Sequence, residues 1–223
     1  MIAQKLFQEL VKDDVAPLLK THGFKKKGMN FGLRGTDVWG LLTFRRDEYN
    51  TADDVSFTIT INVACDKLRD LNGWPFDPKA VPSSDLPTVQ WYADIGDFMI
   101  GKRQSRAYCR YRLGKNEWWR LRTIDDFERV CPAVVAALTD VAIPELRKRR
   151  SLDAITEVYL TTGDDRVLGS TRNLAYALWF QGHEDEARKL LRQELRELER
   201  ERRHALPYFK RALAKLGIDP DTL

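Results

Sequence analysis

The clearest hydrophobic pattern lies at residues 55–63, where apolar and small polar side chains alternate. Five apolar residues take every second position, with four polar residues between them: Val55, Phe57, Ile59, Ile61 and Val63, then Ser56, Thr58, Thr60 and Asn62. A period of two with one apolar and one polar row predicts an antiparallel strand with one side buried. We expect the polar row to form the wet side of a sheet or to line a cleft for an anionic ligand.

Other segments predict further strands. Residues 30–34 and 38–46 predict a hairpin, residues 89–95 and 107–113 alternate, and 118–122 predict a short strand. The buried face of the resulting sheet should consist of ten residues: Val55, Phe57, Ile59, Ile61, Val63, Val89, Trp91, Cys109, Tyr111 and Leu113.

Two segments predict helices that cover one face of this sheet. Residues 2–21 carry apolar side chains at helical spacing, and Pro17 predicts a kink or break there. Thr123 and Asp126 have the spacing of a capping box before a helix that runs to about Ala142. We therefore predict an α+β fold over residues 1–150, with an antiparallel sheet of five to six strands covered on one face by helices.

Residues 151–223 predict a C-terminal helical extension, with helices at 152–161, 171–181, 184–205 and 207–216. The pair around Gly182 resembles one tetratricopeptide-type unit, but an ordinary helical hairpin is favoured, because a free-standing array needs about three units. Leu191, Leu195 and Leu198 form a narrow apolar stripe, which can dock on the domain or pair with a second copy to make a homodimer.

Composition excludes several classes of site. The chain has 223 residues and a formal net charge of +4, from 37 basic and 33 acidic residues. Its three cysteines are widely spaced and its three histidines lack zinc-site spacing, so we expect no disulfide framework, no metal site and no cofactor. No signal-peptide core or long apolar stretch is present, which predicts a cytoplasmic protein without a membrane partner.

The positive charge is concentrated in residues 102–122, which hold eight basic residues and one acid, Glu117. The candidate binding residues for a polyanion or an acidic partner are Lys102, Arg103, Arg106, Tyr108, Arg110, Arg112, Arg120 and Arg122. Alternation places several of them on one strand face, where they can bind a phosphate backbone and stack on bases. The plainer alternative is a solvated sheet face whose arginines pair with acids from elsewhere.

A second basic segment, Lys25, Lys26 and Lys27, lies between Gly23 and Gly28. The glycine spacing matches a phosphate-binding loop, but a helix precedes it and a strand follows, which is the reverse of what such a loop needs. A turn with positive-φ glycines and solvated lysines is favoured, with a weaker phosphate-binding role as the alternative.

Several motifs together resemble a known family. They are an amphipathic N-terminal helix, Gly-Phe-Lys-Lys-Lys-Gly at 23–28, Asn30-Phe31, the alternating strand at 57–63 and Trp-Trp-Arg-Leu at 118–121. As a set they resemble the bacterial domain-of-unknown-function family 4304 over roughly residues 1–150. The resemblance supports the fold and implies no activity and no catalytic residues.

Three functions are compatible with these features. The first is a non-catalytic protein-binding module, such as an adaptor or a neutralising, immunity-type protein, because no catalytic signature is present. The second is a nucleic-acid or polyanion binder that uses the basic sheet face. The third and weakest is an enzyme acting on an anionic substrate, with Tyr108, Asp94 or Asp97 as its acid–base group.

Overall fold

The computed structural model describes residues 2–73, 77, 79–82, 91–95, 118–162 and 170–223. Two compact units are present. The sheet unit comprises Met1–Arg34, Gly40–Asn62 and Tyr92–Lys148, and the helical unit comprises Gly35–Trp39, Val63–Trp91 and Arg149–Leu223. One division between them falls between Lys148 and Arg149, and the helical unit also takes in two earlier segments. The predicted domain boundary near residue 150 stays a prediction.

The sheet has six described strands. These are β1 Lys25–Lys27, β2 Asn30–Arg34, β3 Val38–Arg46, β4 Val55–Cys65, β5 Trp91–Asp94 and β6 Trp119–Leu121. Their order is β1-β2-β3-β4-β5, and β6 also pairs with β4. Antiparallel register places Lys27 opposite Asn30 and Ser56 opposite Arg120. The predicted α+β class and antiparallel sheet are confirmed, whereas the predicted strand at 107–113 lies outside the described residues.

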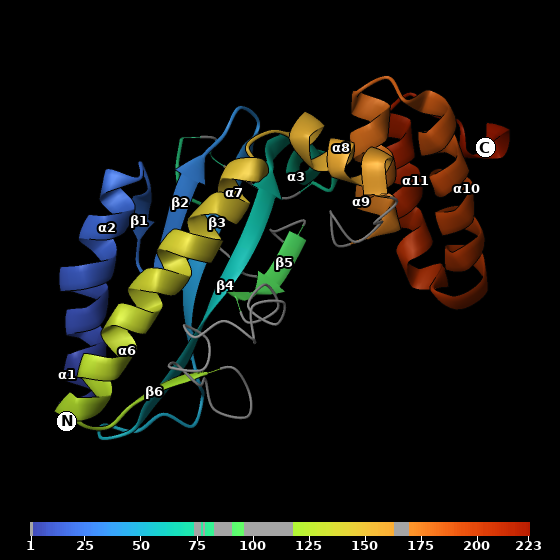
Figure 1. The fold of residues 1–223 in the computed structure, drawn as a ribbon. Helices are drawn as coiled ribbons and strands as arrows, with labels where there is room; N and C mark the ends of the chain where they lie inside the picture. The colour runs from blue at the N-terminus through green and yellow to red at the C-terminus, as the bar shows by residue number, and fades with distance from the viewer. Residues whose placement is uncertain (1, 74–76, 78, 83–90, 96–117, 163–169) are drawn as a thin grey trace. The chain divides into compact units, whose positions relative to one another are not determined.

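Two groups of helices cover one face of the sheet. They are α1 Ile2–Glu9, η1 Leu10–Val15 and α2 Ala16–Thr21, then α6 Ile124–Ala137, η2 Leu138–Ala142 and α7 Ile143–Lys148. Figure 1 shows α1 and α6 on the same side of β2, β3 and β4. The start of α6 is fixed by the predicted capping box, in which Thr123 and Asp126 bond each other's main-chain amides.

Pro17 predicts a kink or break in the first helix, and the structure places a π-helical segment shortly before this proline. Residues 10–15 form a π-helical segment, in which the Ala16 amide donates to the Val11 carbonyl five residues earlier. The same pattern precedes Pro144, where the Ile143 amide donates to Leu138. Because proline lacks an amide donor and crowds the preceding turn, a wider π turn lets each helix continue through it.

Aromatic rings fill the space between the helices and the sheet. Ring centroids lie 4.9 Å apart for Phe7 and Phe57, 5.6 Å for Phe57 and Trp119, and 6.1 Å for Phe44 and Phe57. A side chain at Gly40 would place its Cβ 2.9 Å from Leu146, so glycine lets α7 approach β3 closely. This core holds β6 and the start of α6 in place.

The polar row of β4 does not form a wet face, and that prediction is wrong. Thr58, Thr60 and Asn62 are each at most 3% exposed, and only Ser56 at the strand's start is half-buried. Leu41 and Leu42 of the neighbouring strand β3 point to opposite faces of the sheet, and both are fully buried. The sheet therefore buries both faces here, and the Asn62 amide donates to the Thr60 hydroxyl at 3.1 Å within the buried row.

The helical unit contains the end of β4 and the C-terminal helices. Its helices are α3 Asp66–Leu71, α8 Leu152–Thr162, α9 Thr171–Phe180, α10 Glu184–Glu201 and α11 Leu206–Lys215, with 3₁₀ turns at η4 Arg203–Ala205 and η5 Pro220–Thr222. The predicted hairpin of α9 and α10 is confirmed, and Gly182 adopts a positive φ at its turn. Leu191 and Leu198 of the predicted apolar stripe are fully buried.

No helix in the described parts of the chain has the length and apolar character needed to span a bilayer.

Candidate functional site

The structure describes only some of the residues of the predicted basic site. Lys102, Arg103, Arg106, Tyr108, Arg110 and Arg112 lie outside the described residues, as does Asp97. Asp94 is described in its backbone alone, on β5. Arg120 lies within β6, and Arg122 directly follows this strand. Lys25, Lys26 and Lys27 form β1.

Arg120 and Arg122 share one carboxylate. Arg120 Nε donates to Asp54 Oδ1 at 2.6 Å, and its Nη2 donates to Oδ2 of the same group. Arg122 Nε lies 3.3 Å from Asp54 Oδ2. Asp54 precedes β4 and Arg120 follows 66 residues later, so the pairing of β6 with β4 brings them together.

The pair of arginines keeps Asp54 ionised. The hydrogen bond from Arg120 lowers the pKa of Asp54 below its ordinary value, and the charges of Arg120 and Arg122 add to this against the opposing effect of burial. The carboxylate in turn neutralises part of the positive charge. These two arginines therefore match the plainer alternative, in which basic residues pair with an acid from elsewhere.

The loop between β3 and β4 is ordered by its own hydrogen bonds. The Tyr49 amide donates to Asp47 Oδ1 at 3.1 Å, and Asn50 exchanges hydrogen bonds of 2.8 and 2.7 Å with the main chain of Ser56. Tyr49 itself is 83% exposed. The loop thus holds an aromatic side chain in solvent on a fixed backbone.

A second exposed apolar side chain, Ile124, closely follows Arg120 and Arg122 in the sequence. Ile124 is 56% exposed and begins α6, one residue after Thr123 of the capping box. Arg122, which contacts Asp54, is two positions before it. We call this surface the hairpin end, comprising residues 47–54, Arg120, Arg122 and Ile124. The Gln4 amide also donates to the Ala52 carbonyl here, at 3.4 Å.

The three lysines form the opposite edge of the sheet. Register pairs Lys25 with Gly32, Lys26 with Phe31 and Lys27 with Asn30, and Gly28 turns the chain with φ near +61°. Because β1 and β6 are four strand spacings apart in the sheet order, they are separated by about 19 Å. The structure therefore does not join Lys25–Lys27 with Arg120 and Arg122 in one site.

Lys25–Lys27 differ from the predicted turn in one respect. All three are exposed, as expected, but they form a strand rather than a loop. The Lys26 ammonium lies 5.7 Å from the centre of the Phe31 ring. Lysines on an edge strand discourage unwanted strand pairing, which is a structural reason for their presence.

The described thiols are poorly suited to nucleophilic chemistry. Burial raises the pKa of Cys65 to about 12, and burial together with a hydrogen bond to Asp14 raises the pKa of Cys131 to about 11. Both thiols are therefore protonated at neutral pH. In the described residues no group of three or more His, Cys, Asp or Glu side chains is placed to hold a metal ion.

Sequence reasoning did not single out Tyr49 or Ile124, and it interpreted Asp54 with Asp53 as a cap or turn former rather than as a partner of Arg120. One signal was present for Tyr49, an aromatic residue within the polar segment Asp47-Glu-Tyr-Asn50 between two strands. Nothing local connects Asp54 with Arg120, because their contact depends on strand pairing.

Comparisons with known proteins give one match. No curated protein and no solved structure matches the chain. A family model described as a domain of unknown function (DUF4304) matches residues 15–148, which is more than half of the chain and ends at the last residue of α7. The chain therefore belongs to the DUF4304 family.

Proposed function

We propose that this protein is a non-catalytic protein-binding module, of the adaptor or immunity type, and that it receives its partner on the hairpin end. The observation that carries the proposal is that two exposed apolar side chains, Tyr49 and Ile124, belong to the two segments that the Asp54–Arg120–Arg122 contacts join, residues 47–54 and 120–124. Tyrosine and arginine are the residues that most often dominate binding at protein interfaces.

Hydrogen bonds hold this surface in one conformation, which supports the same function. Hydrogen bonds within residues 47–56 hold the loop, and the capping box holds Ile124. A surface that is ordered before binding loses little conformational entropy when a partner arrives. Of the five large apolar residues that are exposed in the described structure, Ile2, Tyr49 and Ile124 lie at this end, while Leu160 and Tyr208 belong to the helical unit.

The polyanion alternative draws less support from the described residues. Arg120 and Arg122 already share Asp54, and Lys25–Lys27 occupy the opposite sheet edge. Binding of two copies through the C-terminal helices would need a face other than the Leu191–Leu198 stripe, which is buried. Catalysis by Tyr108, Asp94 or Asp97 stays a prediction.

Photo-crosslinking tests the proposal. A benzophenone amino acid replaces Tyr49 in the full chain, and in a matched control it replaces Tyr208, which is also strongly exposed. In nuclease-treated extract from the organism of origin, we expect position 49 to capture one protein that position 208 does not capture. Equal capture at both positions, or capture at neither, would contradict the proposal.

The captured protein is then purified and titrated by calorimetry. Ile124→Asp should weaken binding at least tenfold, because it replaces an exposed apolar side chain of the proposed contact surface with a charge. Leu160→Asp, a similar change at an exposed position of the helical unit, should leave the affinity unchanged. An unchanged affinity for Ile124→Asp would place the interface elsewhere.

A further inference from the structure

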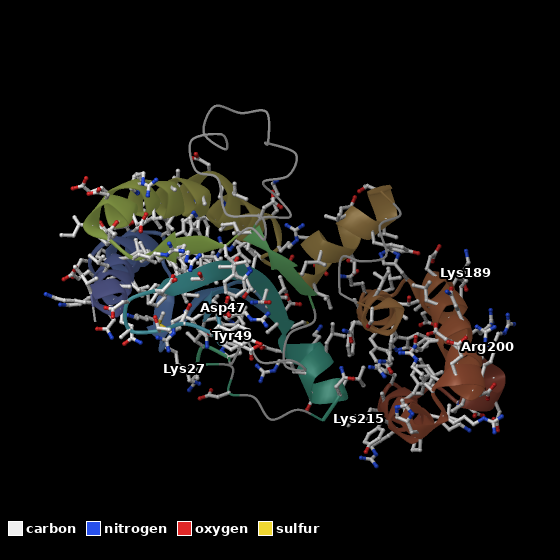
Figure 2. All side chains as sticks on the ribbon, turned by 90° about the horizontal axis from the view of Figure 1, so that it is seen from below. Lys27, Asp47, Tyr49, Lys189, Arg200 and Lys215 are labelled. Carbon is white, nitrogen blue, oxygen red and sulfur yellow. The ribbon has the colours of Figure 1, made fainter. Side chains whose placement is uncertain are left out.

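The outer face of α10 carries a polar hollow. Figure 2 shows Lys189 and Arg200 projecting from α10 on the side away from α9. Seven residues of this helix line a hollow of about 660 Å³: Lys189, Arg192, Gln193, Arg196, Glu197, Arg200 and Glu201. Their spacing of three and four residues places them on one face, while Leu191 and Leu198 on the other face are buried.

The acids in this hollow already have cationic partners. Arg200 Nη2 lies 2.6 Å from Glu201 Oε1, and Arg202, beside the hollow, lies 2.5 Å from Glu197. Arg192 uses its Nε to donate to the Leu223 carbonyl at 2.8 Å, which leaves its two Nη groups.

Two further cations in the hollow carry no such contact. Lys189 and Arg196 make no hydrogen bond or ion pair with any part of the chain that the structure describes. With Arg192 and Gln193 they occupy positions i, i+3, i+4 and i+7, a compact group spanning about 10 Å of the helix axis. We call Lys189, Arg192, Gln193 and Arg196 the donor cluster.

The chemistry of the donor cluster selects a particular kind of ligand group. An ammonium and two guanidinium groups only donate hydrogen bonds, and the Gln193 amide adds two further donors. A phosphate group offers several acceptor oxygens that three cations can approach together, and guanidinium groups bind it in a bidentate manner. The described lining includes no aromatic or aliphatic side chain, so it lacks apolar anchors for a protein partner and a platform for stacking bases.

We propose that the donor cluster is a binding site for the phosphate groups of a ligand. Its residues are separate from the hairpin end, so this site is independent of the proposed protein-binding function.

Calorimetric titration of the full chain with inorganic tripolyphosphate tests this site. We expect saturable binding that weakens at least tenfold in Lys189→Ala/Arg196→Ala. The matched control is Lys210→Ala/Arg211→Ala, which removes the same charge from exposed positions of α11 and should keep the affinity within twofold. Circular dichroism checks that both variants fold.

A parallel titration with a single-stranded oligonucleotide identifies the source of the phosphate. Tighter binding of the oligonucleotide assigns the site to a nucleic-acid backbone, and tighter binding of tripolyphosphate assigns it to a small phosphorylated ligand; both support the site. Absence of binding for both probes overturns it. Equal weakening in the two double variants also overturns it, because it would reflect overall charge alone.

Discussion

Two arginine clusters in this molecule are built from the same residue type and have different chemical capacities. At the hairpin end, Arg120 and Arg122 converge on Asp54. On α10, Arg192 and Arg196 lie beside Lys189, and the acids of that face are already paired with Arg200 and Arg202. The comparison teaches that the ability of a basic cluster to bind an anion depends on the acidic side chains nearby, not on the number of basic residues.

The surroundings of the two clusters differ as well. The segments that form the first cluster also carry the exposed side chains of Tyr49 and Ile124, whereas the second cluster is lined by charged and amide side chains. Apolar anchors around a neutralised ion cluster suit a protein partner. Cationic hydrogen-bond donors that are not neutralised by nearby acids suit an anion.

The largest expected effect comes from removing the ring that supports the first cluster. Phe57 stacks on Trp119, the neighbour of Arg120, and is fully buried. Phe57→Ala should lower the free energy of unfolding by about 3–5 kcal/mol, because a cavity replaces the ring. Urea denaturation measures this loss.

The milder Phe57→Leu variant keeps that test informative if the alanine variant does not fold. It should disturb the hairpin end while tripolyphosphate binding at the donor cluster persists. Equal loss at both clusters would show that they are not independent.

The next largest effect is expected from a substitution that gives the second cluster an acid of its own, as Asp54 is in the first cluster. Gln193→Glu places a carboxylate among Lys189, Arg192 and Arg196 with little change in shape. We expect tripolyphosphate affinity to fall at least tenfold, which corresponds to about 1.4 kcal/mol. Calorimetry measures it, and Gln193→Ala, which adds no charge, should lose less than threefold.

A smaller effect is expected from removing the shared acid of the first cluster. Asp54→Asn should lower the free energy of unfolding by about 1 kcal/mol or less, because both arginines remain about half exposed. Glu48→Gln, an exposed change in the same loop, should have no effect. Urea denaturation of the three proteins measures the difference.

The pH dependence of this difference sharpens the test. Because the folded-state pKa of Asp54 lies below its ordinary value of 3.8, its stabilising contribution is present above that pH and is lost as the pH falls through the folded-state pKa. The gap between wild type and Asp54→Asn should therefore close in acid. A gap that persists at pH 2 would assign the effect to packing.

The smallest effect concerns the helix that packs against α10. The Tyr176 hydroxyl is buried and has no hydrogen-bond partner among the residues that the structure describes, and burial raises the pKa of Tyr176 above its ordinary value of 10.0. Tyr176→Phe should leave the free energy of unfolding unchanged or raise it by up to about 1 kcal/mol, because an unsatisfied polar group is removed. A clear loss in thermal denaturation would reveal a partner for the hydroxyl.

Tyr176 also predicts a loss of stability in alkali. A group whose folded-state pKa is raised contributes stability below its unfolded-state pKa, near 10, and loses it as the pH rises toward the folded-state value. Tyr176→Phe should reduce that loss above pH 10.

Much of the fold followed from local signals in the sequence. The bounds of β2 and β3 match the predicted hairpin, the alternation at 55–63 identified β4, and Thr123 with Asp126 identified the start of α6. These signals act between residues a few positions apart, whose geometry is dictated by backbone dihedral angles and hydrogen bonding. The sequence therefore determined most of the strands and helices, but it did not predict β1 or α3.

Only the tertiary structure decided what these elements present to solvent. Alternation could not tell that Thr58, Thr60 and Asn62 are buried, because a second layer over a sheet depends on distant segments. The contact of Asp54 with Arg120 spans 66 residues and exists only through strand pairing. Burial and charge pairing arise where remote parts of the chain meet, which is why the structure alone distinguishes neutralised arginines from available ones.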